Sequence, residues 1–199
     1  MQVYRIMAVE NCISKQTPFQ SPVPFLRQLS KFTFGTREPD HFTKLTFYLL
    51  LFYWFCFFVW SIASYLTISL REFIMSEKKI PVEEIINSRG LALGFQESEF
   101  LEHLLTAHGI GMVCWLVVLV GLILLWRKQE SYLWFILLPV LFYLGLLLFY
   151  MSPAYFREDV TFFDKSGLVI ILAATLMHFL MLKRERTGGS INLFEEDAE

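Results

Sequence analysis

The chain has 199 residues, of which 55% are hydrophobic, 17% are aromatic and 18% are charged. A soluble domain of this size could not bury so much apolar surface, whereas a lipid bilayer accepts it. Because the formal net charge is only −2, the chain has no basic field that would attract nucleic acid. The sequence therefore predicts an integral membrane protein without a nucleic-acid partner.

Residues 1–44 precede the first long apolar segment and are predicted to form an arm. Within it, the segment 21–34 carries apolar side chains near one face of a helix: Phe25, Leu26, Leu29 and Phe32. This pattern is typical of a short helix that lies in the membrane interface. An extended arm packed on a neighbouring protein fits the same residues, so the sequence leaves both alternatives open.

Four apolar segments follow the arm and make up a predicted transmembrane domain at 45–182. A spanning helix needs about 20 predominantly apolar residues. The segments that meet this requirement are 45–70, 104–126, 132–151 and 167–182. Every Lys, Arg, Asp and Glu lies outside them, as expected because a charge at a helix centre costs about 2.5–3.5 kcal/mol. The predicted fold is an all-α bundle of four transmembrane helices.

The loop at 71–103, between the first two segments, is the only sizeable polar element inside the domain. Pro81 suits the first turn of a short helix, and Gly90 is expected to end that helix. Gly94 interrupts the chain, and helical spacing resumes at Gln96 and continues into the second apolar segment. We therefore expect a short helical loop.

Basic residues are unevenly divided between the two sides of this bundle. The arm, the turn after residue 126 and the tail carry 11 of the 17 lysines and arginines, and the two other loops carry six. By the positive-inside rule, the richer side faces the cytoplasm, or the matrix of a mitochondrion. Both termini then lie inside, and the loop 71–103 lies outside. We expect the bacterial cytoplasmic (inner) membrane, with the mitochondrial inner membrane as the alternative.

The tail, residues 183–199, begins with basic residues and ends with acidic ones around two apolar side chains. Its end is a candidate docking peptide for another subunit, formed by Leu193, Phe194, Glu195 and Glu196. A tail without a partner would have the same composition. The sequence does not choose between these alternatives.

Histidine is the only candidate for chemistry inside the apolar segments. A b-type haem needs two axial ligands at one depth on facing helices. The histidine candidates are His41, His108 and His178, and Met151 could be the second ligand opposite His108. Hydrogen-bonded histidines with a structural role are the commoner case, and ion-coupled transport normally uses a charged residue that these segments lack. We therefore predict no catalytic residue, no metal and no cofactor apart from bound lipid.

Small residues and one proline mark the expected helix contacts. Small side chains let helices approach closely, and a proline frees a carbonyl that needs another partner. The candidate packing residues are Ala107, Gly109, Gly111, Gly121, Pro139, Gly145, Ala173 and Ala174.

The sequence thus offers packing positions and a docking peptide but no catalytic constellation. It predicts a non-catalytic accessory, scaffold or assembly subunit of a larger membrane complex that serves energy transduction, secretion or transport. Its expected partners are the lipid bilayer and other membrane-protein subunits. The alternatives are a redox subunit that binds a b-type haem and a small channel or carrier.

Overall fold

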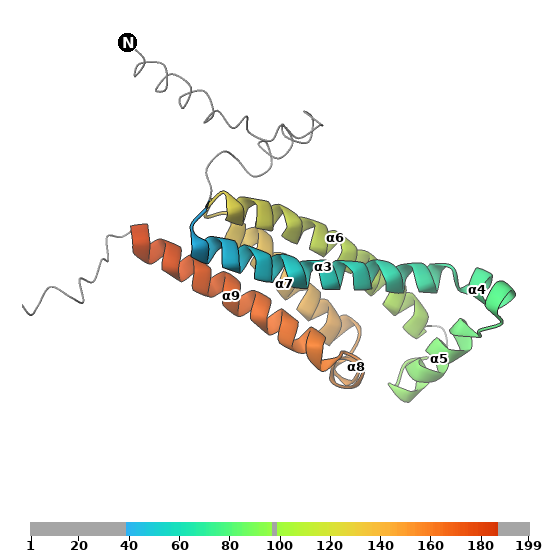
Figure 1. The fold of residues 1–199 in the computed structure, drawn as a ribbon. Coiled ribbons are helices and arrows are strands. Elements are labelled where there is room, and N and C mark those ends of the chain that lie inside the picture. The colour runs from blue at the N-terminus through green and yellow to red at the C-terminus, as the bar shows by residue number, and fades with distance from the viewer. Residues whose placement is uncertain (1–38, 97–98, 187–199) are drawn as a thin grey trace, which may run out of the picture. The chain divides into compact units, whose positions relative to one another are not determined.

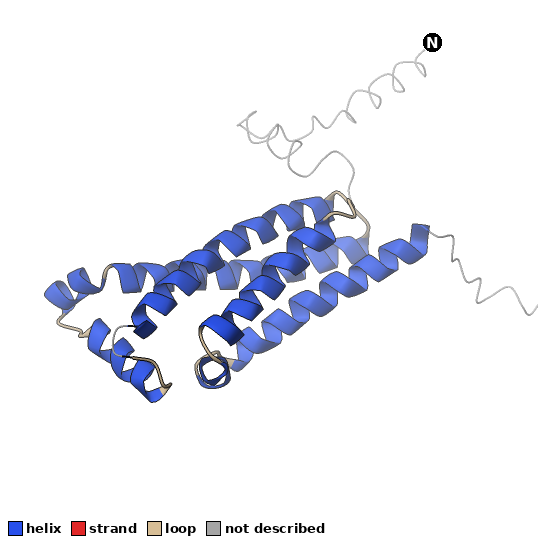
Figure 2. Ribbon diagram, turned by 180° about the vertical axis from the view of Figure 1, so that it is seen from behind, coloured by secondary structure: helices blue, strands red, loops and turns tan. Residues whose placement is uncertain are grey.

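The computed structural model describes residues 39–96 and 99–186. Most of the predicted arm lies outside this part of the chain, as do the candidate docking residues Leu193, Phe194, Glu195 and Glu196. Within the described residues, every regular element is a helix and no strand occurs (Figure 2).

Four helices of the described chain are long and apolar enough to cross a membrane. They are α3 (His41–Ser69), α6 (Glu99–Trp126), α7 (Tyr132–Gly145) with its continuation η2 (Leu146–Tyr150), and α9 (Phe162–Arg186). The prediction of an all-helical fold with four helices able to span a membrane is confirmed. Shorter helices connect them: α4 (Arg71–Lys78), α5 (Val82–Ala92) and α8 (Pro153–Glu158).

The four long helices form a ring of neighbours (Figure 1). α6 packs extensively on both α3 and α7, and α9 closes the ring through smaller contacts with the same two helices. The start of α3, the turn between α6 and α7 and the last turn of α9 lie at one end of the bundle, which we call the terminal end (Figure 1). The opposite end, which we call the loop end, holds α4, α5 and α8.

Hydrogen bonds rather than hydropathy determine where α9 begins. Its apolar segment starts at Gly167, yet the helix starts five residues earlier, at Phe162. The Asp164 backbone N–H donates to Thr161 Oγ1 (3.2 Å), and the Thr161 hydroxyl donates to the Asp164 carboxylate (2.7 Å). This reciprocal cap satisfies a free N–H of the first turn and extends the helix into polar sequence.

The loop helices also differ in extent from the segments expected. α5 ends at Ala92 rather than at Gly90, and Gly94, with a φ of 90°, follows it in the left-handed region. α6 begins at Glu99 and continues through the second apolar segment without a break. α4 was not among the elements expected from the sequence, and none of its residues is buried.

Two of the candidate packing glycines lie where α6 meets another helix. A Cβ atom on Gly121 would lie 2.6 Å from Ile136 Cγ1 and 3.1 Å from the backbone carbon of Phe135, both on α7. A Cβ atom on Gly111 would lie 2.9 Å from the ring of Tyr143. The close approach of α6 to α7 therefore depends on the missing side chains.

The other candidate packing residues have looser surroundings. A Cβ atom on Gly145 would meet no atom within 4 Å, and one on Gly109 would make only ordinary contact with Tyr65. Ala107 is buried, Ala174 is half-buried and Ala173 is exposed. Pro139 lies within α7, and the irregular turn of this span comes later, at η2. There the Met151 N–H donates to the Leu146 carbonyl, a π-helical bond of 3.1 Å.

An aromatic cluster forms the middle of the bundle. The ring of Trp115 on α6 stacks on Phe57 of α3 at a centroid distance of 4.8 Å. Its other neighbour is Tyr143 of α7, which meets it edge to face at 5.5 Å. The indole N–H of Trp54 also donates to the Trp115 carbonyl (2.7 Å). These contacts join three of the four long helices in one apolar core.

Candidate functional site

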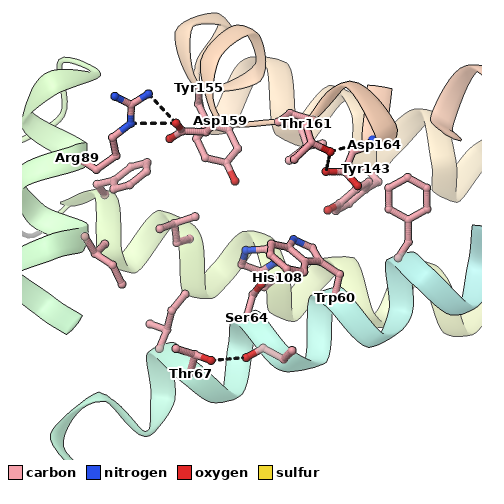
Figure 3. A pocket seen from close by; sticks show the side chains of 18 of the residues that line it. Trp60, Ser64, Thr67, Arg89, His108, Tyr143, Tyr155, Asp159, Thr161 and Asp164 are labelled. Carbon is pink, nitrogen blue, oxygen red and sulfur yellow. Dashed lines mark hydrogen bonds and ion pairs between the residues drawn. The ribbon is translucent and has the colours of Figure 1, made fainter. Parts of the chain in front are cut away.

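A cavity of about 460 Å³ lies at the loop end (Figure 3). Its walls come from α3, α5, α6, α7, η2, α8 and α9 and from the turn between α8 and α9. Much of the lining is aliphatic or aromatic. The polar lining residues are Ser64, Thr67, Arg89, His108, Tyr143, Tyr155, Asp159, Thr161 and Asp164. An apolar pocket of this volume with a few polar groups is typical of small-molecule sites.

The cavity has a buried floor and an exposed side. Phe57 and Leu168 are 4% and 2% exposed and lie deep in the bundle. Trp60 lines the same cavity and is 59% exposed, and Thr67 is exposed as well. Ile85 and Arg89 of α5 and Thr161 before α9 also line the cavity and are exposed, so the cavity is open to its surroundings rather than enclosed. A molecule dissolved in a bilayer could reach the floor through such an opening.

His108 is the buried polar group of the cavity wall. Its side chain lies among the lining residues and is only 8% exposed (Figure 3). No described residue makes a hydrogen bond to its Nδ1 atom. Leaving a buried polar atom unpaired costs about 1–3 kcal/mol. A hydrogen-bonding group of a bound molecule would remove this cost.

An ion-pair cluster closes one side of the cavity. The Arg89 Nε and Nη2 atoms of α5 donate to Asp159 Oδ1 (2.9 and 2.7 Å), and Nη2 also donates to Glu158 (3.2 Å). Hydrogen bonding to Asp159 and the two negative charges raise the pKa of Arg89 above its usual value. The cluster therefore ties α5 to the end of α8, although the two lie about 70 residues apart.

Tyr155 projects from α8 toward the middle of the cavity (Figure 3). Burial, together with the negative charges of Asp159 and Asp164, raises the pKa of Tyr155 to about 12. The phenol therefore stays protonated at neutral pH and can donate a hydrogen bond.

A second polar arrangement lies at the terminal end, where it connects α3, α7 and α9 with the turn that follows α6. Lys128, in the turn between α6 and α7, forms an ion pair with Asp40, the N-cap of α3. Asp40 accepts hydrogen bonds from the Thr43 backbone N–H (3.1 Å) and the Thr43 hydroxyl (2.6 Å). Thr43 Oγ1 lies 3.0 Å from His178 Nε2 on α9, and His178 Nδ1 lies 2.8 Å from the Tyr132 hydroxyl on α7.

The charge of Asp40 determines the direction of these hydrogen bonds. Partial burial acts to raise the pKa of Asp40, but the hydrogen bonds from Lys128 and Thr43 outweigh it and lower the pKa well below its usual value. An ionised carboxylate only accepts, so the Thr43 hydroxyl donates to Asp40 and accepts from His178 Nε2. A neutral imidazole then accepts at Nδ1 from the Tyr132 hydroxyl.

The four haem candidates divide between the two ends of the bundle. His41 is exposed at the start of α3, and His178, at the same end, has both ring nitrogens in hydrogen bonds. His108 lies in the cavity wall, and Met151 is fully buried after η2 at the loop end. Haem binding stays an alternative to the prediction that the chain has no cofactor apart from lipid. In the described ranges, no three side chains of His, Cys, Asp or Glu gather as a metal site.

Several cavity residues could not be found from the sequence. Arg89, Tyr155, Asp159 and Asp164 belong to polar connections, where charged and aromatic residues are ordinary. The only sequence signal was His108, a histidine inside an apolar segment. No protein-family model, no curated protein and no solved structure matches the chain.

The lowered pKa of Asp40 predicts a stability loss in acid that depends on this carboxylate. Its folded pKa lies below the unfolded value of 3.8, so its contribution is complete above about pH 4 and is lost as the pH falls further. We expect Asp40→Asn to lower stability at neutral pH and to flatten the acid limb of the profile. Thermal unfolding in detergent from pH 6 down to about pH 3 measures this. Glu77→Gln, an exposed acid on α4, is the control, and an equal flattening by Glu77→Gln would contradict the prediction.

Proposed function

We propose that this chain is a non-catalytic membrane protein that binds a small amphiphilic molecule in the loop-end cavity. One observation carries the proposal: an open cavity of about 460 Å³ contains a buried histidine nitrogen without a hydrogen-bond partner. The apolar floor suits a hydrocarbon or aromatic portion, and His108 and Tyr155 suit a polar group. Binding of this kind would serve a carrier, a receptor or the ligand-holding subunit of a complex.

The proposal includes an orientation and a membrane. The positive-inside rule places the terminal end, with Lys128 and Arg184, on the cytoplasmic or matrix side. The cavity then faces the outer leaflet, from which an amphiphile can enter beside Trp60. This orientation fits the bacterial inner membrane, which we propose, and also the mitochondrial inner membrane, which is the alternative.

A cavity-filling substitution tests the binding function. Ala63 lines the cavity on the exposed part of α3, so we expect Ala63→Trp to fill the site without disturbing the buried core. Its matched control is Ala173→Trp, because Ala173 is also an exposed alanine of a spanning helix and does not line the cavity.

The measurement is mass spectrometry of the small molecules extracted from each purified protein. We expect at least one amphiphile to be extracted with the wild type and with the control. In Ala63→Trp the amount of this amphiphile should fall about tenfold, which corresponds to a binding free energy weakened by about 1.4 kcal/mol. The same compounds in the same amounts in all three proteins would contradict the proposal.

Membership of a larger complex is a second candidate function, and a stripe on α3 favours it. Five exposed apolar side chains recur at alternating spacings of three and four residues: Leu45, Tyr48, Phe52, Phe55 and Val59. This is the spacing with which one helix packs along another. Three of the five side chains are aromatic, and such a face suits lipid or a broad partner surface.

Native mass analysis of the protein extracted from its own membranes in mild detergent tests this candidate. We expect a particle well above 23.4 kDa that contains other proteins. Substituting Phe52 and Phe55 by Ala should release those proteins, whereas Leu141→Ala, at an exposed position on α7, should not. A particle that holds one copy of this chain and no other protein would exclude the accessory role.

A further inference from the structure

The charged groups of the cavity wall leave one carboxylate without a counter-charge. Arg89 is the cation of the lining, and Asp159 and Glu158 already engage it. Asp164 accepts a hydrogen bond from the Thr161 hydroxyl, and no cation among the described residues forms an ion pair with it. Asp164 is only partly exposed, so water screens its charge incompletely.

Aromatic rings surround the same space. They come from α3, α6, α7 and α8 and are Phe57, Trp60, Phe100, Tyr143 and Tyr155. The face of an aromatic ring carries negative electrostatic potential and attracts organic cations, and several rings around one cavity form the usual recognition site for ammonium groups. A cation would therefore meet a carboxylate and several aromatic side chains in this cavity, whereas Asp164 would repel an anion.

The behaviour of Tyr155 agrees with this sign of charge. After burial, the charges of Asp159 and Asp164 are the further causes that raise the pKa of this phenol. The two carboxylates thus act on a group that points into the cavity (Figure 3). Both carboxylates would attract a positive charge bound beside Tyr155.

We propose that the ligand of this cavity is a hydrophobic cation, an amphiphile whose ammonium head also carries a hydrogen-bonding group for His108, either its own N–H or a neighbouring oxygen. The inference rests on the proposed binding function and adds the charge of the ligand. The head lies by Asp164 and the aromatic rings, and the apolar part lies on the floor against Phe57 and Leu168. Two sources supply this chemistry: an ammonium-bearing phospholipid and a free amphiphilic ammonium compound.

Matched probes separate the charge of the ligand from its hydrophobicity. Equilibrium dialysis of the full chain in a neutral maltoside detergent would compare labelled octyltrimethylammonium with octyl chains that carry a neutral tert-butyl head or an anionic sulfonate head. Ala63→Trp corrects for partition into the micelle. We expect saturable binding of the cation, about tenfold tighter than that of either analogue.

Two variants locate the charge recognition. Asp164→Asn should weaken binding of the cation about tenfold and leave the neutral analogue unchanged. Glu102→Gln is the control, since Glu102 is an exposed acid of α6 outside the cavity lining. Because Asp164 also caps α9, Trp60→Leu provides a second test that leaves the cap intact. It should reduce the preference for the cation over the neutral analogue.

A lipid arm of the experiment identifies the source. Competition by phosphatidylcholine but not by phosphatidylglycerol, both in mixed micelles, would assign the ammonium head to a lipid, and lack of competition by either would assign it to a free compound. Equal affinity for all three octyl probes, or no effect of Asp164→Asn and Trp60→Leu on the preference, would overturn the cationic ligand while the binding function stands. Absence of saturable binding of any probe would overturn both.

Discussion

Gly121→Leu is expected to lower the free energy of unfolding by about 3 kcal/mol, because α6 and α7 would have to separate. A Cβ atom at this position already lies 2.6 Å from Ile136 Cγ1 and 3.1 Å from the backbone carbon of Phe135, and backbone cannot move aside as a flexible side chain can. The rest of the leucine side chain has no space at all.

Gly145→Leu is the matched control for this substitution. Both changes replace a helical glycine by leucine, which gains about 0.8 kcal/mol of helix propensity in each case. A Cβ atom on Gly145 meets nothing within 4 Å, so this variant should be as stable as the wild type or more stable. Thermal unfolding in detergent should show a midpoint about 6–12 °C lower for Gly121→Leu. Equal midpoints for the two variants would show that the α6–α7 contact does not depend on Gly121.

The buried hydrogen bonds of His178 are expected to couple α7 to α9. His178→Leu removes the hydrogen-bond partner of the Tyr132 hydroxyl, and Tyr132 is fully buried. Tyr132→Phe removes the same hydrogen bond from the side of His178 Nδ1. Each single substitution should cost about 1–3 kcal/mol. The double substitution removes both members of the pair, so it should cost about 1 kcal/mol less than the sum of the two.

Unfolding in mixed micelles of the wild type, both single variants and the double variant measures this coupling energy. Thr175→Val is the control, since the Thr175 hydroxyl is also buried but donates only to the Ile171 carbonyl of its own helix. It should cost less than about 1 kcal/mol. Strictly additive effects of the two substitutions would mean that the Tyr132–His178 hydrogen bond contributes nothing to the packing of α7 on α9.

Histidine chemistry shows how far the sequence could be interpreted. The four haem candidates, three histidines and one methionine, were selected from the sequence by residue type and by position along a helix. Both properties are local. The partners of His178 are not local: Thr43 lies 135 residues away and Tyr132 lies 46 residues away. No spacing along the chain indicates that these three side chains meet, because their meeting depends on the order of helices in the ring.

The glycines show the same limit from the packing side. Gly121 and Gly145 look alike in sequence, each a small residue inside an apolar span. Only the placement of α7 against α6 makes Gly121 a contact and leaves Gly145 open. A pattern of small residues therefore predicts that close contacts exist without predicting which residues make them.

By itself, the sequence determined that the chain has four helices able to span a membrane and determined nearly where each of them lies. The physical reason is that the transfer of apolar and charged side chains between water and lipid depends on each segment alone. The tertiary structure decided the cavity, because its walls come from residues between Phe57 and Leu168 on separate helices. It also decided that His108 lies in that wall while His178 is held in hydrogen bonds, since burial and hydrogen bonding depend on neighbours that are distant in the chain.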